Sequence, residues 1–421
     1  MRTAYKCRAY PNAEQAALLA RTFGCVRLVW NRALAERQRA YRSEGRATSY
    51  KAADAALTAW KREADLAFLN EVSSVPLQQT LRHQHAAFAN FFAGRARYPR
   101  FKRRTARQSA HYTRSAFRMR SGELTLAKSD APLRFVWSFE NVEVAALNPT
   151  MVVVSREPDG RWYVSFAVDT DAPEPLPETG HAIGVDFGLK DLMVTSDGVR
   201  IANPRTLERK VRHLARYQRR MARCRKGGSN RRKAQAKVAR AHRKVRNARR
   251  DHLHRASTGM IRRADTIVIE DLAVSSMVKN RRLARSISDA GWGELRRQLE
   301  YKAERHGRRL VVIDRWYPSS KTCSTCGHVL GELGLSTRRW TCPHCRSWHD
   351  RDLNAAKNIL AAGLVVAGDG PGEVCGADVR RQGPSLPQSA VKQKPTVARA
   401  TGLPSRQRGE GRQSPSSMPK R

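Results

Sequence analysis

The sequence predicts a mixed chain: a helical N-terminal region, a small all-β part and an α/β domain that carries an inserted cysteine knuckle. Three changes of pattern predict this order. Apolar residues recur at helical spacing through about the first ninety residues. Short alternating runs, typical of β-strands, then continue to about residue 170. Beyond residue 180, apolar strands alternate with basic helical segments, as in an α/β sheet.

The first part of the chain combines one strand with several helices. Residues 1–10 alternate like an edge strand, and we assign residues 1–12 to the first strand of a small β-barrel. Residues 13–112 form the predicted helical region, with helical periodicity at 13–45, 50–60 and 75–92.

The middle of the chain is predicted to complete the barrel. Five short alternating runs lie within 113–170, and turn residues such as Asp159 and Gly160 separate them. The proline-rich segment 171–180 is a stiff linker and marks a domain boundary.

The α/β domain is predicted to begin after this linker and to span 181–317. Strands are expected at 182–186, 192–196, 199–202, 266–269 and 309–313, with a helix near 293–305. A basic helical arm at 204–263 is broken near Gly227, with Ser229 or Asn230 as the N-cap of its second helix. Apolar faces on its two halves would pack as an antiparallel hairpin.

The C-terminal part is predicted to contain a zinc ribbon at 318–349 and a last segment of the α/β domain at 350–367, with a helix from about Leu353. Residues 368–421 are rich in Pro, Gly, Ser, Gln and Arg. Such a composition buries too little apolar surface to offset ordering entropy, so we expect a disordered tail.

The formal net charge of +43 indicates a polyanionic partner that covers a large surface. A packaging protein of ribosomal or chromatin type would fit the charge, but it would not need carboxylates embedded in apolar strands. No apolar run reaches the roughly 18 residues of a membrane span. The start of the chain lacks the apolar segment of a signal peptide. We therefore expect a cytoplasmic or nucleoid location and no membrane partner.

Three carboxylates stand at the ends of predicted elements. Asp186 ends the strand at 182–186 ahead of Gly188, Glu270 ends the strand at 266–269, and Asp352 precedes the last helix. A buried carboxylate is costly unless a metal or a counter-charge meets it. Carboxylates from separate parts of a sheet can hold two Mg²⁺ ions about 3.5–4 Å apart for phosphodiester cleavage.

Each carboxylate taken alone also has a structural interpretation. Asp352 could simply be a helix N-cap, and Asp271 and Asp350 are close rivals in the sequence. Taken together, and within a basic shell, the set favours a site for Mg²⁺ or Mn²⁺. Asp186 would bridge the two ions, and Glu270 and Asp352 would each complete one.

Four of the eight cysteines are clustered as two Cys-x-x-Cys pairs, and the spacing of Cys323, Cys326, Cys342 and Cys345 matches a tetrahedral Cys₄ zinc ribbon. Two pairs at this separation argue against a redox dithiol. A minor alternative is that His344 or His349 replaces one cysteine. With four thiolate ligands the zinc would be structural, because no coordination position stays open for chemistry.

The arm from Arg205 to Arg250 contains twenty Lys and Arg residues and one acidic residue, Glu208. A charged helix is usually just solvated, but this density of like charge would repel itself without an anion. We expect the arm to bind nucleic-acid backbone, through Arg219, Arg220, Arg231, Arg232 and Lys233. In the run from Tyr98 to Lys102, Tyr98 or Phe101 would stack on a base beside Arg100 and Lys102; a loop tucked into the barrel is equally compatible.

Several motifs in this order resemble those of the TnpB (OrfB-type) insertion-sequence proteins, which are related to type V CRISPR effectors. They are Tyr5-Lys-Cys-Arg-Ala-Tyr-Pro-Asn12, Phe23-Gly-Cys-Val-Arg-Leu-Val-Trp-Asn31, Tyr98-Pro-Arg-Phe-Lys102, Gly184-Val-Asp-Phe-Gly188, Ile269-Glu-Asp-Leu272, Ser319-Ser-Lys-Thr-Cys323 and Asp350-Arg-Asp-Leu-Asn-Ala-Ala356. The resemblance covers about residues 1–365.

The resemblance implies an RNase H-like (RuvC) nuclease domain whose carboxylates are Asp186, Glu270 and Asp352, in preference to Asp271 and Asp350. It implies a guide RNA, a double-stranded DNA target with a short adjacent motif, and possible cooperation with a separate transposase. The N-terminal helices and the barrel, called the wedge, would bind RNA and read that motif, with Tyr50, Gln78 and Gln79 as candidate readers.

The expected activity is therefore RNA-guided DNA cleavage, although such proteins often carry the label transposase. Two alternatives stay open. A non-cleaving RNA-guided regulator of transposition would be expected to lose carboxylates, and all three are present. An RNA-binding scaffold would not need them.

Overall fold

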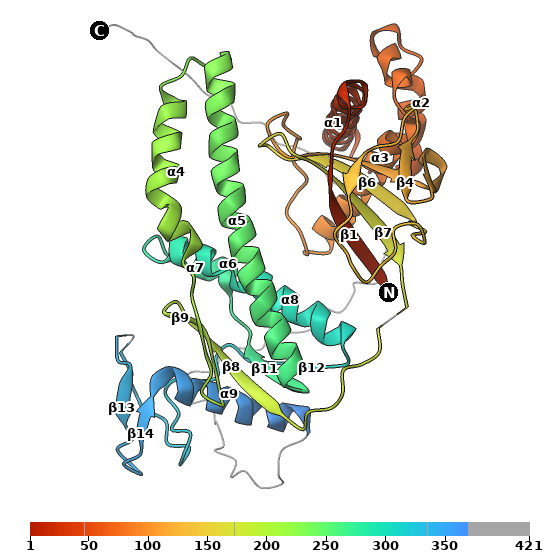
Figure 1. Cartoon of the computed structure of the whole chain (residues 1–421). Helices are drawn as coiled ribbons and strands as arrows, with labels where there is room; N and C mark the ends of the chain where they lie inside the picture. Colours follow the sequence, from red (N-terminus) through yellow and green to blue (C-terminus); the bar gives the residue numbers. More distant parts are fainter. Residues whose placement is uncertain (46, 172, 335, 369–421) are drawn as a thin grey trace, which may run out of the picture. The chain divides into compact units, whose positions relative to one another are not determined.

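The computed structural model describes residues 1–45, 47–171, 173–334 and 336–368 (Figure 1). The predicted tail lies outside the described residues from position 369 on. Among the described helices, none has a stretch long and apolar enough to cross a bilayer.

The N-terminal helices are α1 (Ala13–Glu44), α2 (Tyr50–Trp60), a 3₁₀ segment η1 (Ala64–Glu71) and α3 (Ser74–Phe92). Helix α1 starts with a capping box, in which Asn12 and Gln15 each accept a hydrogen bond from the other's backbone N–H. It ends at Gly45, whose φ of 62° lies in the left-handed region that favours glycine. Val29, Leu57 and Leu77 are buried in the core that these helices share.

The first sheet is antiparallel, with strand order β2-β6-β7-β1-β5. Its strands are β1 (Arg2–Ala9), β2 (Gln108–Thr113), β5 (Phe135–Val136), β6 (Met151–Arg156) and β7 (Trp162–Asp169). A separate hairpin joins β3 (Phe117–Arg120) to β4 (Glu123–Leu126), and a short 3₁₀ turn, η2 (Arg114–Ala116), precedes it. The order of these described strands is open, so a closed barrel stays a prediction.

Two expectations for this sheet were wrong in detail. The strand at residues 1–10 is not an edge strand, because Arg8 and Ala9 pair with β5 while the whole strand pairs with β7. Residues 108–112, which we assigned to the helical region, lie in strand β2 and pair with β6. The sequence does not show where this strand starts, because a basic run precedes Gln108 and only two residues of the strand, Ala110 and Tyr112, are buried.

The second sheet has strand order β10-β9-β8-β11-β12 and forms the centre of the α/β part. Strands β8 (Ala182–Phe187), β9 (Asp191–Thr195) and β10 (Arg200–Ala202) are antiparallel neighbours, whereas β11 (Thr266–Glu270) and β12 (Arg309–Ile313) run parallel to β8. The predicted strand positions at 182–186, 266–269 and 309–313 are confirmed to within a residue.

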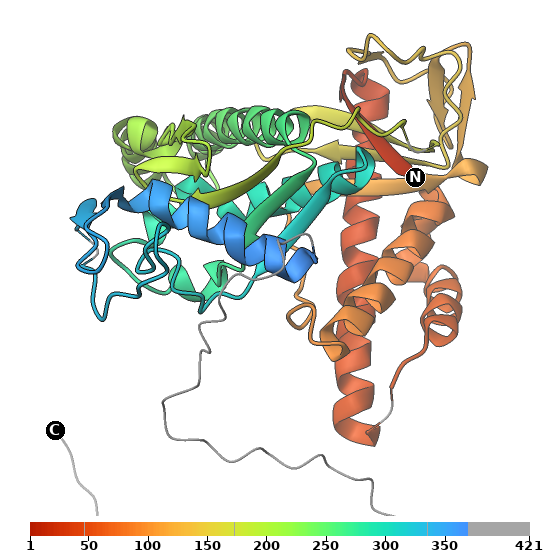
Figure 2. The same ribbon diagram turned by 90° about the horizontal axis from the view of Figure 1, so that it is seen from below.

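Helices cover both faces of this sheet (Figures 1 and 2). Ile267 and Ile269 of β11 point into the core shared with α5 (Ser229–Arg263) and α8 (Trp292–Arg305). Val268, between them, packs on the opposite face with Ile359 of α9 (Arg351–Ala367). This alternation is the expected result of side chains that point to opposite faces along a strand.

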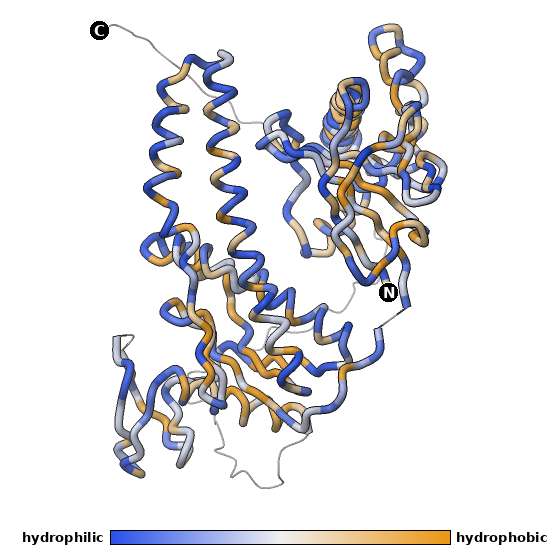
Figure 3. Tube along the Cα trace, in the orientation of Figure 1, coloured by the Kyte–Doolittle hydropathy of each residue, from blue (hydrophilic) through white to orange (hydrophobic). Residues whose placement is uncertain are grey.

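The basic arm is a hairpin of α4 (Thr206–Ala222) and the N-terminal half of α5, as predicted. Figure 3 shows mainly hydrophilic residues along both helices. The predicted N-cap of α5 was wrong, since Gly228 occupies that position and Ser229 is the first helical residue. Two short helices, α6 (Val274–Met277) and α7 (Ala284–Ala290), were not predicted.

Candidate functional site

Asp186 and Glu270 lie near the ends of two neighbouring parallel strands. Val185 of β8 is paired with Ile269 of β11, so the two carboxylate residues follow in register. Asp352 lies in the first turn of α9, which crosses the same sheet. The crossing is close, because a Cβ at Gly184 would collide with the backbone of α9 at Ala356 and Leu360. A glycine in β8 thus allows the helix that carries Asp352 to approach the strand that carries Asp186.

The charges of Glu270 and Asp352 act on the buried carboxylate of Asp186. Burial, and then the charges of Glu270 and Asp352, raise the pKa of Asp186 to about 7. Burial also raises the pKa of Glu270, although a hydrogen bond from Ser319 opposes this shift. Negative groups gathered in a poorly solvated place resist ionisation, and a bound cation would relieve that cost.

A chain of hydrogen bonds connects Glu270 to the cysteine knuckle. The hydroxyl of Ser319 donates to the Glu270 carboxylate. The side-chain amide of Asn358, on α9, donates to the carbonyls of Ser319 at 2.8 Å and Thr322 at 2.6 Å. Asn354, one turn earlier, donates to the Thr322 carbonyl at 2.7 Å and accepts from the Ser324 N–H at 2.9 Å. The loop between β12 and the cysteines is therefore fixed to α9.

The rival carboxylates have structural partners. Asp271 binds the guanidinium groups of Arg296 and Arg315, which hold its pKa below the usual value. Asp350 is the N-cap of α9 and accepts from the Leu353 N–H at 3.1 Å. The alternative that Asp352 is the N-cap was therefore wrong by two residues. The Asp352 side chain does not cap α9.

Asp352 has a different neighbour. Nη1 of Arg338, which precedes β13 (Arg339–Thr341), lies 3.5 Å from its Oδ1. Within the described residues, the carboxylates of Asp186, Glu270 and Asp352 do not form a group whose oxygens all lie within 4.8 Å of one another. The structure nevertheless brings the three residues to one edge of the sheet, close enough for the charges of Glu270 and Asp352 to act on Asp186.

The four cysteines do converge. Their sulfur atoms all lie within 4.8 Å of one another, with 3.6 Å between Cys323 and Cys345 and 3.7 Å between Cys326 and Cys342. Four sulfurs at about 2.3 Å from a tetrahedral zinc would be about 3.8 Å apart. The donor set and its spacing therefore fit a metal ion.

The backbone around the cysteines forms two similar turns. Gly327 follows the first pair with a φ of 74°, and Arg346 follows the second with a φ of 61°. The hairpin of β13 and β14 (Trp348–Asp350) then carries the second pair. His349 Nε2 lies 3.1 Å from the Cys323 sulfur, outside the four-sulfur group. His344 stacks on His328 at 5.8 Å. The group of close ligand atoms consists of the four cysteines, which favours the Cys₄ set over one that includes a histidine.

The basic and aromatic run at 98–102 is attached to the N-terminal helices. Tyr98 makes edge contacts with Phe88 and Phe91, at centroid distances of 5.4 and 5.2 Å. Lys102 lies over the Trp30 ring at 4.1 Å, and the Arg100 carbonyl accepts from the Trp30 indole. Phe101 stays 51% exposed. Of the two aromatic candidates for base stacking, Phe101 is thus the more accessible.

The candidate motif readers differ in accessibility. Gln79 is only 9% exposed within α3, which argues against its contact with nucleic acid. Gln78 is partly exposed. The Tyr50 hydroxyl, at the start of α2, accepts a hydrogen bond from Arg82 of α3 at 3.2 Å.

The five residues of the basic arm that we expected to bind nucleic-acid backbone fall into two groups by their contacts within the protein. Arg231 caps the end of α4, because its guanidinium donates to the carbonyls of Met221 at 2.9 Å and Cys224 at 3.3 Å. The other four side chains are exposed, and none has an ion pair among the described residues; they are Arg219, Arg220, Arg232 and Lys233.

Sequence reasoning missed the supporting residues. Ser319 and Asn354 lay inside quoted motifs, but nothing in the local pattern indicated which carboxylate or carbonyl each would meet. Asn358 and Arg338 had no signal at all, since their partners are distant in sequence.

Comparisons with known proteins agree with this architecture. Residues 165–281 match the OrfB_IS605 family, described as "Probable transposase". Residues 292–359 match the Cas12f1-like TNB domain, and residues 1–46 match the helix-turn-helix domain of OrfB_IS605 proteins.

Two full-length relatives are similar. A Streptomyces pristinaespiralis protein named "Putative RNA-guided DNA endonuclease" is 52% identical over 96% of this chain and 98% of its own. "Putative RNA-guided DNA endonuclease InsQ" of Escherichia coli K12 is 31% identical over 93% of this chain and 97% of its own.

A solved structure shares the fold. It is titled as the Cas12f1-sgRNA-target DNA complex, with a TM-score of 0.51 and 13% identity over 85% of this chain and 98% of that chain. The class defined by fold and site is thus a mixed α/β fold like that of Cas12f1, with a cluster of four cysteines. The identity to the two relatives extends over nearly the full length of both chains and shows the family. The chain belongs to the TnpB (OrfB-type) family of insertion-sequence proteins.

Proposed function

We propose that this protein is a transposon-encoded, RNA-guided DNA endonuclease that cuts next to a short target-adjacent motif. The observation that carries the proposal is the meeting of Asp186, Glu270 and Asp352 at one edge of the α/β sheet, where burial and mutual repulsion raise the pKa of Asp186. The names of the two full-length relatives support the same activity.

The α/β domain would be RNase H-like (RuvC). Support comes from the sheet, in which an antiparallel hairpin of β8 to β10 continues into parallel strands β11 and β12. Residues 1–12 and 113–170 would form the wedge barrel, and residues 13–112 would bind nucleic acid together with the arm.

Asp186, Glu270 and Asp352 would hold Mg²⁺ or Mn²⁺. When bound, such ions activate a water and stabilise the leaving oxygen of a phosphodiester. Ser319 orients Glu270 by its hydrogen bond, and the Asn358 amide fixes the Ser319 backbone. Arg338 would offer a positive charge beside Asp352 where negative charge develops on the phosphate.

The four cysteines would hold one structural zinc. The sulfur spacing of 3.6–3.7 Å supports this, as does the occupation of every tetrahedral position by sulfur. The loop that Asn354 and Asn358 fix leads directly into this cluster, so the ribbon would help to keep Ser319 in place.

The experiment is to express the protein with the DNA flanking its gene, to sequence the RNA that copurifies, and to supply matched DNA. We expect one discrete guide RNA and Mg²⁺-dependent cutting of DNA that carries the matching segment. A protein that binds such an RNA and its target but leaves the DNA intact would instead be a regulator. A separate transposase of the same element would be identified from the neighbouring gene.

A further inference from the structure

We propose that His349 is a positioning residue of the zinc ribbon. Its imidazole Nε2–H donates a hydrogen bond to the zinc-bound thiolate of Cys323 and links the cysteine cluster to the start of the helix that carries Asp352. This inference rests on the zinc site of the proposed function and specifies a side chain that stabilises it from outside the four ligands.

The His349 ring meets the Cys323 sulfur in a buried place. Its Nε2 lies 3.1 Å from the Cys323 Sγ; His349 is 7% exposed and Cys323 is 1% exposed. His349 is not part of the group of four sulfur atoms that lie within 4.8 Å of one another. It therefore contacts a ligand of the proposed ion without being a ligand itself.

The chemistry of the sulfur determines which partner donates the proton. A thiolate that binds zinc has lost its proton, so it can only accept a hydrogen bond. A neutral imidazole carries one proton, on either Nδ1 or Nε2. The contact with Cys323 is made by Nε2, so the proton belongs on that nitrogen. A hydrogen bond to a charged acceptor is stronger than one between neutral groups.

Trp340 holds the His349 ring in this orientation. It lies directly opposite His349 in the hairpin of β13 and β14, and the two ring centroids are 4.6 Å apart. Trp340 is itself buried. A ring that is packed in place before the metal binds loses little rotamer freedom when the hydrogen bond forms.

The simpler alternative is that His349 only fills space beside Trp340. A phenylalanine would serve that purpose at least as well, whereas a buried histidine needs a partner for its N–H. The histidine within the second Cys-x-x-Cys pair shows the difference, since His344 is exposed and stacks on His328. The contact of Nε2 with the Cys323 sulfur thus favours the positioning role.

The residue after His349 caps helix α9. Asp350 accepts from the Leu353 N–H at 3.1 Å, so β14 passes directly into the first turn of the helix. Asp352 lies in that turn. A hydrogen bond that fixes His349 therefore also fixes the strand end from which the carboxylate helix starts.

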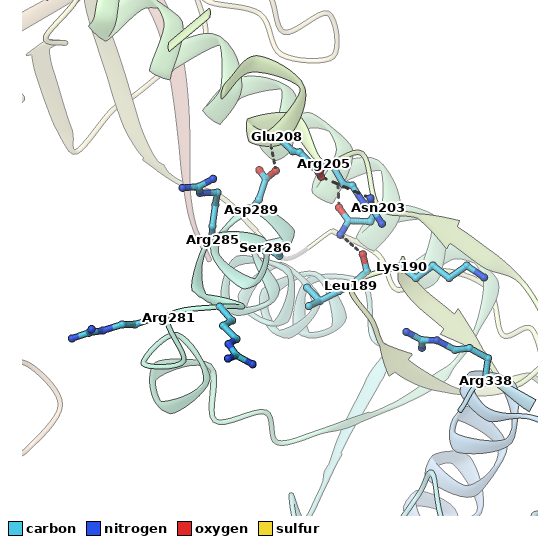
Figure 4. A pocket seen from close by; sticks show the side chains of 11 residues that line it. Leu189, Lys190, Asn203, Arg205, Glu208, Arg281, Arg285, Ser286, Asp289 and Arg338 are labelled. Carbon is cyan, nitrogen blue, oxygen red and sulfur yellow. Dashed lines mark hydrogen bonds and ion pairs between the residues drawn. The ribbon is translucent and has the colours of Figure 1, made fainter. Parts of the chain in front are cut away.

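Further contacts join the ribbon to the same helix. The N–H of Ser324, which follows Cys323, donates to Asn354 Oδ1 at 2.9 Å. The Arg351 N–H donates to the Arg338 carbonyl at 2.9 Å. Figure 4 shows the Arg338 side chain on the wall of a pocket that the turn between β8 and β9 also lines. The cysteine cluster, the hairpin and the start of α9 thus form one connected unit.

The hydrogen bond should lower the reactivity of the Cys323 sulfur. It withdraws negative charge from the thiolate, which is the form of cysteine that attacks electrophiles. Partners of this kind orient the ligands, and their loss typically costs about 10–100-fold in metal affinity. Loss of His349 should therefore weaken zinc binding and make Cys323 easier to modify.

The test uses the full zinc-loaded chain and three variants. His349→Phe keeps an aromatic ring beside Trp340 but has no N–H. His349→Gln restores a donor, because the side-chain amide of glutamine carries N–H groups. His344→Phe is the matched control, since it makes the same change at an exposed position of the same ribbon.

We expect His349→Phe to weaken zinc binding by about 10–100-fold in competition with a chelator, and His349→Gln to regain most of this loss. Iodoacetamide should alkylate Cys323 several-fold faster in His349→Phe than in the parent. With Co²⁺ in place of zinc, the sulfur-to-cobalt charge-transfer band should move to longer wavelength, because the sulfur holds its electrons less tightly without the hydrogen bond. His344→Phe should change none of these.

The link to α9 has its own measurement. With zinc bound, hydrogen exchange at the Ser324 and Leu353 amides should be faster in His349→Phe than in the parent, because both amides donate at the start of the helix. Parent-like protection of both amides would contradict this link.

A measurement on the unaltered protein covers the case in which His349→Phe does not fold. NMR of the zinc-loaded chain with ¹⁵N-labelled histidine, assigned by comparison with His349→Gln, should show His349 protonated on Nε2. A ring protonated on Nδ1 alone would overturn the proposal. Parent values of zinc affinity, alkylation rate and cobalt spectrum in a folded His349→Phe would overturn it as well.

These results are independent of DNA cleavage. A parent that binds no zinc would refute both the zinc site of the proposed function and the role of His349. A zinc-loaded parent in which His349→Phe behaves as the control does would refute only the role of His349. A parent that shows the expected zinc and histidine but does not cut matched DNA would retract the nuclease activity and leave this inference in place.

Discussion

Gly184 is the residue on which the meeting of β8 and α9 depends. We expect Gly184→Ala to destabilise the protein by about 1–3 kcal/mol, because the new methyl group would overlap the α9 backbone. Gly259→Ala is the matched control, since a Cβ there meets nothing within 4 Å and alanine stabilises a helix by up to about 1 kcal/mol. Chemical denaturation measures both, and an equal effect would contradict the close crossing.

Asp186 should make the metal-free protein sensitive to pH. Its pKa of about 7 is above the ordinary value of 3.8, so folding favours the protonated form and stability falls as pH rises from about 4 to 7. Asp186→Asn removes this loss, and its gain in Tm over the parent should be larger at pH 8 than at pH 5.

Calorimetry without added divalent ions makes this comparison. The exposed Asp130→Asn should give no pH-dependent difference. A gain from Asp186→Asn that is equal at both pH values would show that Asp186 is not held among buried negative charges.

Ser319 should matter for metal binding, because it holds Glu270 by its hydroxyl. Removal of an outer hydrogen bond typically costs 10–100-fold in metal affinity. We expect Ser319→Ala to weaken Mn²⁺ binding by about that factor and Ser319→Thr to restore it, as measured by electron paramagnetic resonance. Ser320→Ala is the control, and identical Mn²⁺ affinities for Ser319→Ala and the parent would refute the role.

Residue types could be predicted from the sequence more readily than their partners. Asp186, Glu270 and the cysteines were chosen because strand ends and Cys-x-x-Cys spacing are local patterns. The contacts of Ser319, Asn358 and Arg338 join segments far apart in the chain, so no local pattern contains them. Gln79 was a candidate motif reader because its contacts also come from distant segments. In the structure it is a buried residue of α3.

At the scale of elements, we expect the fold of the proposed zinc ribbon to depend on its metal. Cys342 is fully buried within the four-sulfur group. We expect Cys342→Ser to lose about one zinc per chain and to increase hydrogen exchange over residues 323–350, because structural zinc sites contribute folding energy directly. Cys224→Ser, outside the cluster, should leave the zinc content unchanged. A zinc-free protein with the parent's exchange would contradict a structural zinc site.

Long periodic elements were predictable, and short or basic ones were not. Helices α1 and α3 and strands β8, β11 and β12 agree with the expected ranges, because burial of one face imposes a clear period. Strand β2 follows a basic run, and α6 and α7 bury too few residues to leave a period. The cap of α4 comes from Asp289 on another helix, which a search for local N-cap residues does not reveal.

At the scale of the whole molecule, the charge of +43 predicts the kind of partner but not where it binds. The structure separates cations that have protein partners, such as Arg231 and Arg296, from exposed cations that form no ion pair with the described residues, such as Arg219 and Arg281. Sequence could not make this separation, because partners of ion pairs come from different elements.

The most direct measurement is single-turnover cleavage of guide-matched DNA by the RNA-loaded protein, with Mg²⁺ titrated from zero. The variants are Asp186→Ala, Glu270→Ala and Asp352→Ala, with Asp271→Ala as the matched control. We expect cutting that requires Mg²⁺, is abolished by each of the first three changes while RNA and target binding persist, and survives the control. Robust Mg²⁺-dependent cutting by any of those three variants would contradict the assignment of this carboxylate site as the nuclease centre.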